Sequence, residues 1–127
     1  MYWLFRSGNH LSLDNKRSLY LSILRPIWSY GAPIWGCAAR SNILLLQRQQ
    51  NLILRKITGS PWYVTNASLH HDLHIPTVAE TIRQLYTSYE TRLHKHVNDL
   101  AIRLLEDPPV RRLQRRHIQD LVWIDPA

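Results

Sequence analysis

The feature that most constrains the fold is a four-residue spacing of apolar side chains in the first third of the sequence. Two adjoining rows have this spacing: Leu19, Ile23 and Ile27 in one, and Tyr20, Leu24 and Trp28 in the other. Residues four apart lie on the same side of an α-helix, so the rows predict a helix near residues 15–30 with one buried face. Ser12 or Asp14 is placed to cap it. Pro26 lacks a backbone N–H and is expected to kink or restart this helix.

A second apolar helix is predicted near residues 42–58. A cap at Ser41 or Asn42 would start it, and Gly59 would end it. Its buried stripe is expected to comprise Ile43, Leu46, Ile53, Leu54 and Ile57. This stripe would face the same core as the first helix.

The clearest start signal for a helix lies at Thr77 and Glu80, which have the spacing of a capping box. The helix predicted from this signal, near residues 77–97, has a full amphipathic stripe. The stripe comprises Val78, Ile82, Leu85, Tyr86, Tyr89, Leu93 and Val97. Shorter helices are predicted from an Asn66 cap through Leu73, from Asn98 or Asp99 to about Glu106, and over residues 110–121.

These patterns predict an all-α fold, a small bundle of about four to six helices without a β-sheet. The three long helices are expected to share one core. Its members would include Ile23, Ile27, Leu46, Ile53, Leu54, Leu85 and Tyr89. Cys37, the single cysteine, cannot form an internal disulfide, fits a reducing compartment and is expected to be a small buried side chain.

Aromatic side chains gather around the second predicted helix. The set of interest comprises Trp28, Tyr30, Trp35 and Trp62. A base-stacking platform is one interpretation, but the first two lie on or beside an apolar helical row, which favours the core. Trp62 and Tyr63, in the connector after the second helix, are expected to pack onto the bundle.

The charge of the chain is strongly uneven. The net charge is +7 and the pI is near 10.1. Residues 1–57 hold eight Lys or Arg against one acid, Asp14, whereas residues 58–127 hold eight of each. Arg48 and Arg55, seven residues apart, are expected to share an outer helix face. A one-sided basic charge is typical of a surface that follows phosphates, and the alternative is a solvated face that only confers solubility.

The sequence lacks the residues of several kinds of active site. Two-metal phosphoryl transfer needs converging carboxylates, and the first seventy-one residues offer only Asp14. His70 and His74 are four apart, but Pro76 places His74 at a helix boundary, so no metal site is predicted. No phosphate-binding glycine loop and no nucleophile with a neighbouring base is recognisable.

Neither a secretion signal nor a membrane span is predicted. The first six residues are too short and too aromatic for a signal peptide. The longest charge-free apolar stretch, residues 26–39, is shorter than the ~18 to 20 residues of a membrane span and contains two prolines. We expect a soluble, intracellular protein, in the nucleus or the cytoplasm or both, without a membrane partner. The aromatic start, which has no cap or turn before it, suggests a segment of a longer protein.

Several ordered segments together resemble a known family. They are residues 19–31 (with LRPIWSYG at 24–31), WGCA at 35–38, SNI at 41–43, LQRQQN at 46–51, LR at 54–55, PWYV at 61–64 and HHDLHIPTV at 70–78. Over nearly its whole length the chain resembles the C-terminal part of jockey-type non-LTR retrotransposon polyproteins.

The resemblance implies a position after the reverse-transcriptase palm. Residues 1–65 would correspond to the thumb and residues 66–127 to a helical post-thumb segment, packed as one unit. The catalytic signature of the family, an aromatic residue followed by x-Asp-Asp in the palm, has no counterpart in this sequence. Members of the family are RNA-directed DNA polymerases, but this chain is expected to be inactive alone. No cofactor is expected in it, since a divalent metal would be bound by the palm.

The resemblance also implies partners. A polymerase thumb is a helical bundle that grips the RNA/DNA template-primer duplex through backbone contacts that do not read sequence. The palm of the parent polymerase would be its second partner. The candidate nucleic-acid-binding residues are Lys16, Arg17, Arg25, Arg48, Arg55 and Lys56. The alternative is an element-derived small helical protein-interaction module without a nucleic-acid role.

Overall fold

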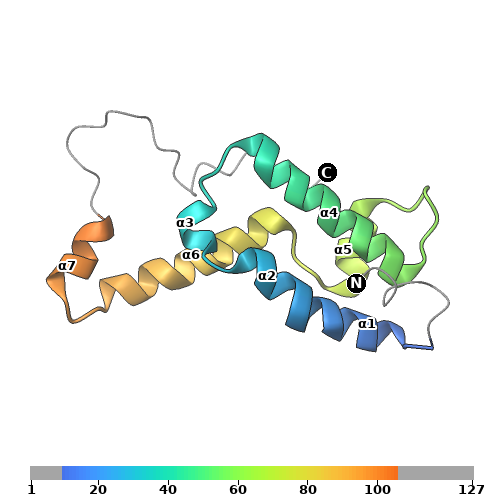
Figure 1. Ribbon diagram of the computed structural model, residues 1–127, viewed down its shortest axis with the longest axis horizontal. Helices are drawn as coiled ribbons and strands as arrows, with labels where there is room; N and C mark the ends of the chain where they lie inside the picture. Colours follow the sequence, from blue (N-terminus) through green and yellow to red (C-terminus); the bar gives the residue numbers. More distant parts are fainter. Residues whose placement is uncertain (1–9, 106–127) are drawn as a thin grey trace.

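The computed structural model describes residues 10–105 (Figure 1). The helices in chain order are α1 (Leu13–Leu19), α2 (Arg25–Ser29), α3 (Ala32–Trp35), α4 (Arg40–Thr58), α5 (Asn66–Leu73), α6 (Val78–His94) and α7 (Asp99–Ile102). A π-helical turn, Tyr20–Leu24, joins α1 to α2, and a 3-10 turn, Arg103–Leu105, follows α7. Residues 10–105 contain no strand, so the predicted all-α fold is confirmed for this part of the chain.

The first helical segment runs from α1 through the π-helical turn into α2 (Figure 1). Ser12 caps it as predicted, because its hydroxyl oxygen accepts a hydrogen bond from the Asn15 N–H. The wide turn ends at Leu24, two residues before Pro26, whose ring would clash with the carbonyl four residues earlier in a regular α-helix. The Arg25 N–H bonds to the Tyr20 oxygen, five residues back. The expected break at Pro26 is therefore absorbed by a π-helical turn.

This turn also decides which apolar row is buried. Tyr20 is fully buried, and Leu24 packs beside it in the same cluster. Ile23 and Ile27 are 42% and 68% exposed, so their predicted place in the core is wrong. A regular α-helix completes a turn in about 3.6 residues, and a row spaced by four drifts around it. The wider π-helical turn keeps the row of Tyr20 facing inward and leaves the neighbouring row outside.

α4 begins two residues before the prediction and ends where predicted. Its N-cap is Ala39, which makes no side-chain hydrogen bond, so the proposed caps at Ser41 and Asn42 are wrong. Gly59 ends it with φ of 65°, a left-handed conformation that favours glycine. Its buried residues are Ile43, Gln47, Gln50, Leu54 and Ile57, while the predicted Leu46 and Ile53 are partly buried. The two buried glutamines were not predicted.

The capping box that starts α6 is confirmed. The Thr77 N–H donates to Glu80 Oε2 at 2.8 Å, and the Glu80 N–H donates to Thr77 Oγ1 at 3.3 Å. α5 spans the predicted residues but is capped by the Thr65 side chain instead of Asn66. α6 ends at His94, before the fully exposed Val97.

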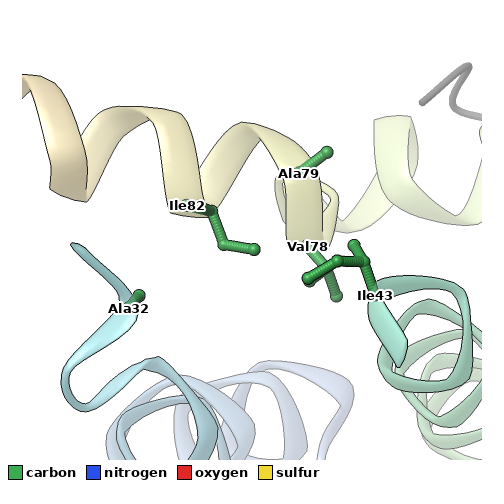
Figure 2. Close-up of a cluster of buried hydrophobic side chains, with 5 residues drawn as sticks. All are labelled: Ala32, Ile43, Val78, Ala79 and Ile82. Carbon is green, nitrogen blue, oxygen red and sulfur yellow. The ribbon is translucent and has the colours of Figure 1, made fainter. Parts of the chain in front are cut away.

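Two apolar clusters replace the single core that the sequence predicted. The first joins α3, α4 and α6 through Ala32, Ile43, Val78, Ala79 and Ile82 (Figure 2). The second joins the π-helical turn, α4 and the α5 region through Tyr20, Leu54, Ile57, Leu73 and Ile75. Leu46 and Leu85 pack on the first cluster and Ile53 on the second, whereas Tyr89 is half-buried. α4 contributes to both clusters and is the central element of the fold.

A polar network, here called the polar seam, joins α4 to α5 and includes two buried glutamines of α4. It comprises Gln47, Gln50, Asn51 and His70. Gln47 Oε1 accepts from the Val78 N–H at 2.9 Å, at the start of α6. Gln50 Nε2 donates to the Tyr20 hydroxyl at 3.0 Å and to the Pro76 oxygen at 2.9 Å. The polar seam therefore ties α4 to the π-helical turn and to the α5–α6 connection.

His70 belongs to this structure and is not arranged as a metal ligand. Its Nδ1 lies 2.8 Å from the Ile75 carbonyl oxygen. Its Nε2 lies 2.9 Å from Asn51 Oδ1. Among residues 10–105, no group of three His, Cys, Asp or Glu side chains is placed to hold a metal ion.

The far end of α6 extends away from α4, and α7 lies beside that end (Figure 1). Asn98 caps α7 as predicted, and the 3-10 turn carries the chain to Leu105. The helix expected over residues 110–121 lies outside the described residues. No helix between residues 10 and 105 is long and apolar enough to cross a membrane.

Two further predictions about burial are wrong. Cys37 is exposed in the turn after α3, where its Sγ lies 3.5 Å from the Ile34 oxygen. Tyr30 is 88% exposed, because its left-handed neighbour Gly31 turns the chain between α2 and α3. Trp28 and Trp35 pack against the first apolar cluster, so their predicted place in the core is confirmed.

Candidate nucleic-acid interface

The outer face of α4 is basic and free of acids. The helix contains four cations, Arg40, Arg48, Arg55 and Lys56, and no Asp or Glu. Its buried stripe fixes which side faces solvent, and the exposed side carries Arg48, Leu52 and Lys56 at successive four-residue steps. Arg48 and Lys56 therefore lie about 12 Å apart along the helix axis, at about 1.5 Å per residue. The next acid in the sequence after Asp14 is Asp72.

Arg55 does not share this outer face as the sequence predicted. It is half-buried, and its guanidinium donates to the loop after α4. Nη1 bonds to the Pro61 oxygen at 3.1 Å, and Nη2 bonds to the Val64 oxygen at 2.6 Å and to Asn66 Oδ1 at 2.9 Å. Arg55 thus holds both ends of the loop against the last turn of α4.

The loop held by Arg55 comprises residues 59–65 and is here called the aromatic loop. Thr58 and Ser60 join their hydroxyls at 2.7 Å at its start, and the Val64 N–H donates to the Pro61 oxygen at 3.2 Å. Trp62 is 89% exposed and Tyr63 is 71% exposed, so the expectation that they pack onto the bundle is wrong. Their ring centroids lie 6.1 Å apart in an edge-to-face arrangement at 80°.

The exposure of these rings has a visible cause in the sequence. Gly59 and Pro61 break the helical pattern, and Thr65 starts α5, so Trp62 and Tyr63 belong to no apolar stripe. An aromatic residue outside every periodic row has no helix face to place it in the core. Such a residue, between a helix stop and a helix cap, is the signal that could have identified the loop.

Two of the basic candidates on α1 face the bundle. Arg17 Nε donates to the Leu73 oxygen at 2.6 Å, which satisfies a carbonyl at the C-terminus of α5. Lys16 is 6% exposed. Both side chains therefore have packing roles that the charge count did not reveal.

Arg25 lies at a different place from α4's outer face. It is half-buried and lines an open cleft of about 650 Å³. Other residues of this cleft include His71 and His74 of the α5 end and Glu80 of α6. The Glu80 carboxylate already accepts the hydrogen bonds of the capping box. The structure thus brings Arg48 and Lys56 together on one exposed face, with Arg55 beside them, and places Arg25, Lys16 and Arg17 apart from that face.

Comparison with known proteins gives a consistent set of relatives. The chain is 45% identical over 125 residues to the probable RNA-directed DNA polymerase from transposon X-element of Drosophila melanogaster, covering 98% of this chain and 14% of that protein. It is 43% identical over 114 residues to the probable RNA-directed DNA polymerase from transposon BS of the same species, covering 90% of this chain and 13% of that protein. It is 37% identical over 131 residues to the RNA-directed DNA polymerase from mobile element jockey of Drosophila funebris, covering 96% of this chain and 14% of that protein.

The chain spans about 14% of the length of these curated relatives. No protein-family model and no solved structure matches it.

Proposed function

Because the chain belongs to the jockey-type family of non-LTR transposon RNA-directed DNA polymerases, we propose that it is the thumb and post-thumb segment of such an enzyme. In this role it grips the RNA/DNA template-primer duplex beside the palm. The relatives carry the name RNA-directed DNA polymerase. In this proposal the palm supplies the catalytic carboxylates and their divalent metal, and residues 15–71 of this chain contain no Asp or Glu.

The observation that supports this proposal is the acid-free outer face of α4. Arg48 and Lys56 are exposed there, about 12 Å apart along one helix, which suits contacts to separate phosphates of a nucleic-acid backbone. Backbone contacts position a duplex without reading its sequence. A polymerase that must copy any template needs a grip of this kind.

The salt dependence of binding tests the proposal. A fluorescein-labelled RNA/DNA hybrid would be titrated with the chain, and anisotropy measured at a series of KCl concentrations. We expect affinity to fall steeply with salt, because each neutralised phosphate releases counterions. The double variant Arg48→Ala/Lys56→Ala should reduce the slope of log K against log salt by about two.

A matched control removes the same charge elsewhere. Arg92 and Lys95 are exposed near the far end of α6, away from α4 (Figure 1). The variant Arg92→Ala/Lys95→Ala should keep the parental slope. An equal reduction of the salt slope in the two double variants would show a general charge effect and would contradict an interface on α4.

A second candidate function rests on exposed apolar residues. Ile23, Ile27, Tyr30 and Ile34 are exposed along the π-helical turn, α2 and α3. Isolated exposed apolar residues are common, but several successive ones indicate a covered surface. In a polymerase this surface would pack against the palm, and in an element-derived interaction protein it would bind another protein.

Co-expression distinguishes these roles. The chain would be co-expressed with the palm segment of its parent polymerase, and complex formation measured by co-purification. Ile27→Glu should abolish the complex while leaving hybrid binding by the isolated chain unchanged. A chain that neither co-purifies with the palm segment nor binds the hybrid in a salt-dependent way would favour the protein-interaction function.

A further inference from the structure

The geometry points to the aromatic loop as a stacking site for unpaired bases of single-stranded nucleic acid, next to the basic face of α4. This inference rests on the proposed function and adds a substrate class to it. Trp62 and Tyr63 are 89% and 71% exposed, whereas large aromatic side chains are normally buried in a fold of this size. Their edge-to-face contact leaves the Trp62 ring in solvent.

The loop is held in place before any ligand arrives. Arg55 makes two hydrogen bonds to it, at 3.1 and 2.6 Å, to backbone oxygens on either side of the aromatic pair, and a third, at 2.9 Å, to Asn66 Oδ1 at the start of α5. Thr58 and Ser60 fix its start. A loop fixed in this way loses little conformational entropy when a ligand binds, so its exposed rings form a prepared surface and do not need to be ordered by binding.

The charge around the loop favours a polyanion over a protein as its occupant. Arg55 and Lys56 occupy the last turn of α4, directly before the loop. The loop itself contains no charged residue, and no Asp or Glu occurs between Asp14 and Asp72. Aromatic rings beside a cationic, acid-free helix are the combination that binds single strands, since the rings stack on bases while the cations attract the backbone.

Unpaired bases are the required substrate because paired bases hide their faces in the duplex. A stacking site can therefore accept bases only from a single-stranded overhang or from a frayed end. The outer face of α4 and the aromatic loop adjoin in the chain, so one nucleic acid can contact both. The proposed ligand is a duplex whose single-stranded extension reaches Trp62 and Tyr63.

The test compares overhangs with and without bases. Anisotropy would be measured for a blunt RNA/DNA hybrid, for the same hybrid with a short single-stranded overhang, and for that hybrid with an abasic overhang. The abasic strand keeps its phosphates and loses its bases. We expect the base-bearing overhang to bind roughly 5- to 100-fold more tightly than the abasic one, from the usual effect of one aromatic–base stack.

Variants assign this preference to the loop. Trp62→Ala should reduce it to near unity, and Trp62→Phe should keep much of it because phenylalanine also stacks. Tyr30→Ala is the matched control, since Tyr30 is equally exposed but lies between α2 and α3. Equal binding of both overhangs by the parent chain, or an equal preference in the Trp62→Ala variant, overturns the inference and leaves the loop as a protein contact.

The outcome also separates this inference from the proposed function. Salt-dependent binding of the blunt hybrid without any preference for base-bearing overhangs would contradict the stacking site and leave the proposed function supported. A base preference in a chain that does not bind the blunt hybrid would support the stacking site and contradict the duplex grip.

Discussion

The guanidinium of Arg55 donates a 2.6 Å hydrogen bond from Nη2 to the backbone oxygen of Val64, nine residues later in the chain. The same nitrogen bonds to Asn66 Oδ1 at 2.9 Å, at the start of α5. A helix residue therefore holds the following loop and the next helix together. This contact explains how two aromatic rings stay exposed on an ordered loop.

Arg55→Ala should loosen the aromatic loop. The variant loses three charge-assisted hydrogen bonds at a half-exposed site, two to loop oxygens and one to Asn66, and we expect it to lower the free energy of unfolding by about 1–3 kcal/mol. Hydrogen exchange of a peptide covering residues 59–66 should accelerate, whereas exchange in α6 should change little. Arg48→Ala, on the exposed face of the same helix, is the control and should leave loop exchange unchanged. An unchanged loop in Arg55→Ala would show that the guanidinium contacts are dispensable.

The sequence predicted several helix limits because the signals that set them are local. The Thr77–Glu80 capping box, the Gly59 stop and the Ser12 cap each depend on a few neighbouring residues, and all three are confirmed. The buried face of the first helix was predicted in part only. Two adjoining apolar rows compete for the core, and a π-helical turn before Pro26 selects the row of Tyr20.

The candidate site was less predictable than the fold. Counting cations identified the basic first half, but it could not separate Arg48, which is exposed, from Arg17, which caps a helix end. That distinction depends on contacts 56 residues apart in the chain. Likewise the sequence alone suggests that Gln47 and Gln50 face solvent. They are buried because they bond to backbone groups of the α5–α6 connection, which lie far from them in the chain.

Gln47→Leu should destabilise the fold strongly. The change removes the acceptor of the Val78 N–H and the donor to Gln50 Oε1 and Asn51 Oδ1. Buried polar groups left without partners cost about 1–3 kcal/mol each, so we expect a total loss of about 2–4 kcal/mol in urea unfolding. Gln49→Leu, two residues along the same helix and on its exposed side, should change stability by less than about 0.5 kcal/mol. Similar unfolding midpoints for the two variants would show that the polar seam contributes little.

Tyr20 should make the fold sensitive to alkaline pH. Burial raises the pKa of the Tyr20 hydroxyl above its ordinary value of 10.0, and the hydrogen bond from Gln50 only partly opposes this. The unfolded chain therefore loses this proton first as the pH rises. Stability is fully present below about pH 10 and falls as the pH rises through the folded pKa, because the native state then binds more protons than the unfolded state.

Tyr20→Phe tests this dependence. The variant should lose about 1 kcal/mol at pH 7 through the missing hydrogen bond to Gln50. It should also show a shallower decline in unfolding free energy between pH 9 and roughly pH 11 than the parent chain. Parallel pH profiles for the two proteins would mean that other groups cause the alkaline unfolding.

Ile27 and Ile57 should respond differently to truncation. Ile27 is 68% exposed on α2, whereas Ile57 is almost fully buried in the second apolar cluster. Ile27→Ala should change the free energy of unfolding by less than about 0.5 kcal/mol, and Ile57→Ala should lower it by about 2–4 kcal/mol. Chemical denaturation of both variants checks the choice of buried row, and a large loss in Ile27→Ala would place that row in the core after all.

Arg48 and Arg55, which the sequence grouped on one face, should have separable effects on nucleic-acid binding. Arg48 is exposed on the same helix face as Lys56, so Arg48→Ala should make the salt slope for a blunt RNA/DNA hybrid shallower by about one and leave any preference for base-bearing overhangs intact. Arg55 holds the aromatic loop, so Arg55→Ala should mainly reduce the overhang preference.

Two further variants sharpen this comparison. Arg55→Lys keeps the positive charge but cannot reproduce the forked contacts to Pro61 and Val64, so it should lose the overhang preference while retaining the parental salt slope. Reversing the charge of the tail cations should change the slope less, because acids in the same half offset them; these residues, which lie outside the described part of the chain, are Arg111, Arg112, Arg115 and Arg116. If the tail variant loses binding while Arg48→Ala keeps the parental slope, the nucleic-acid surface lies in the second half of the chain and not on α4.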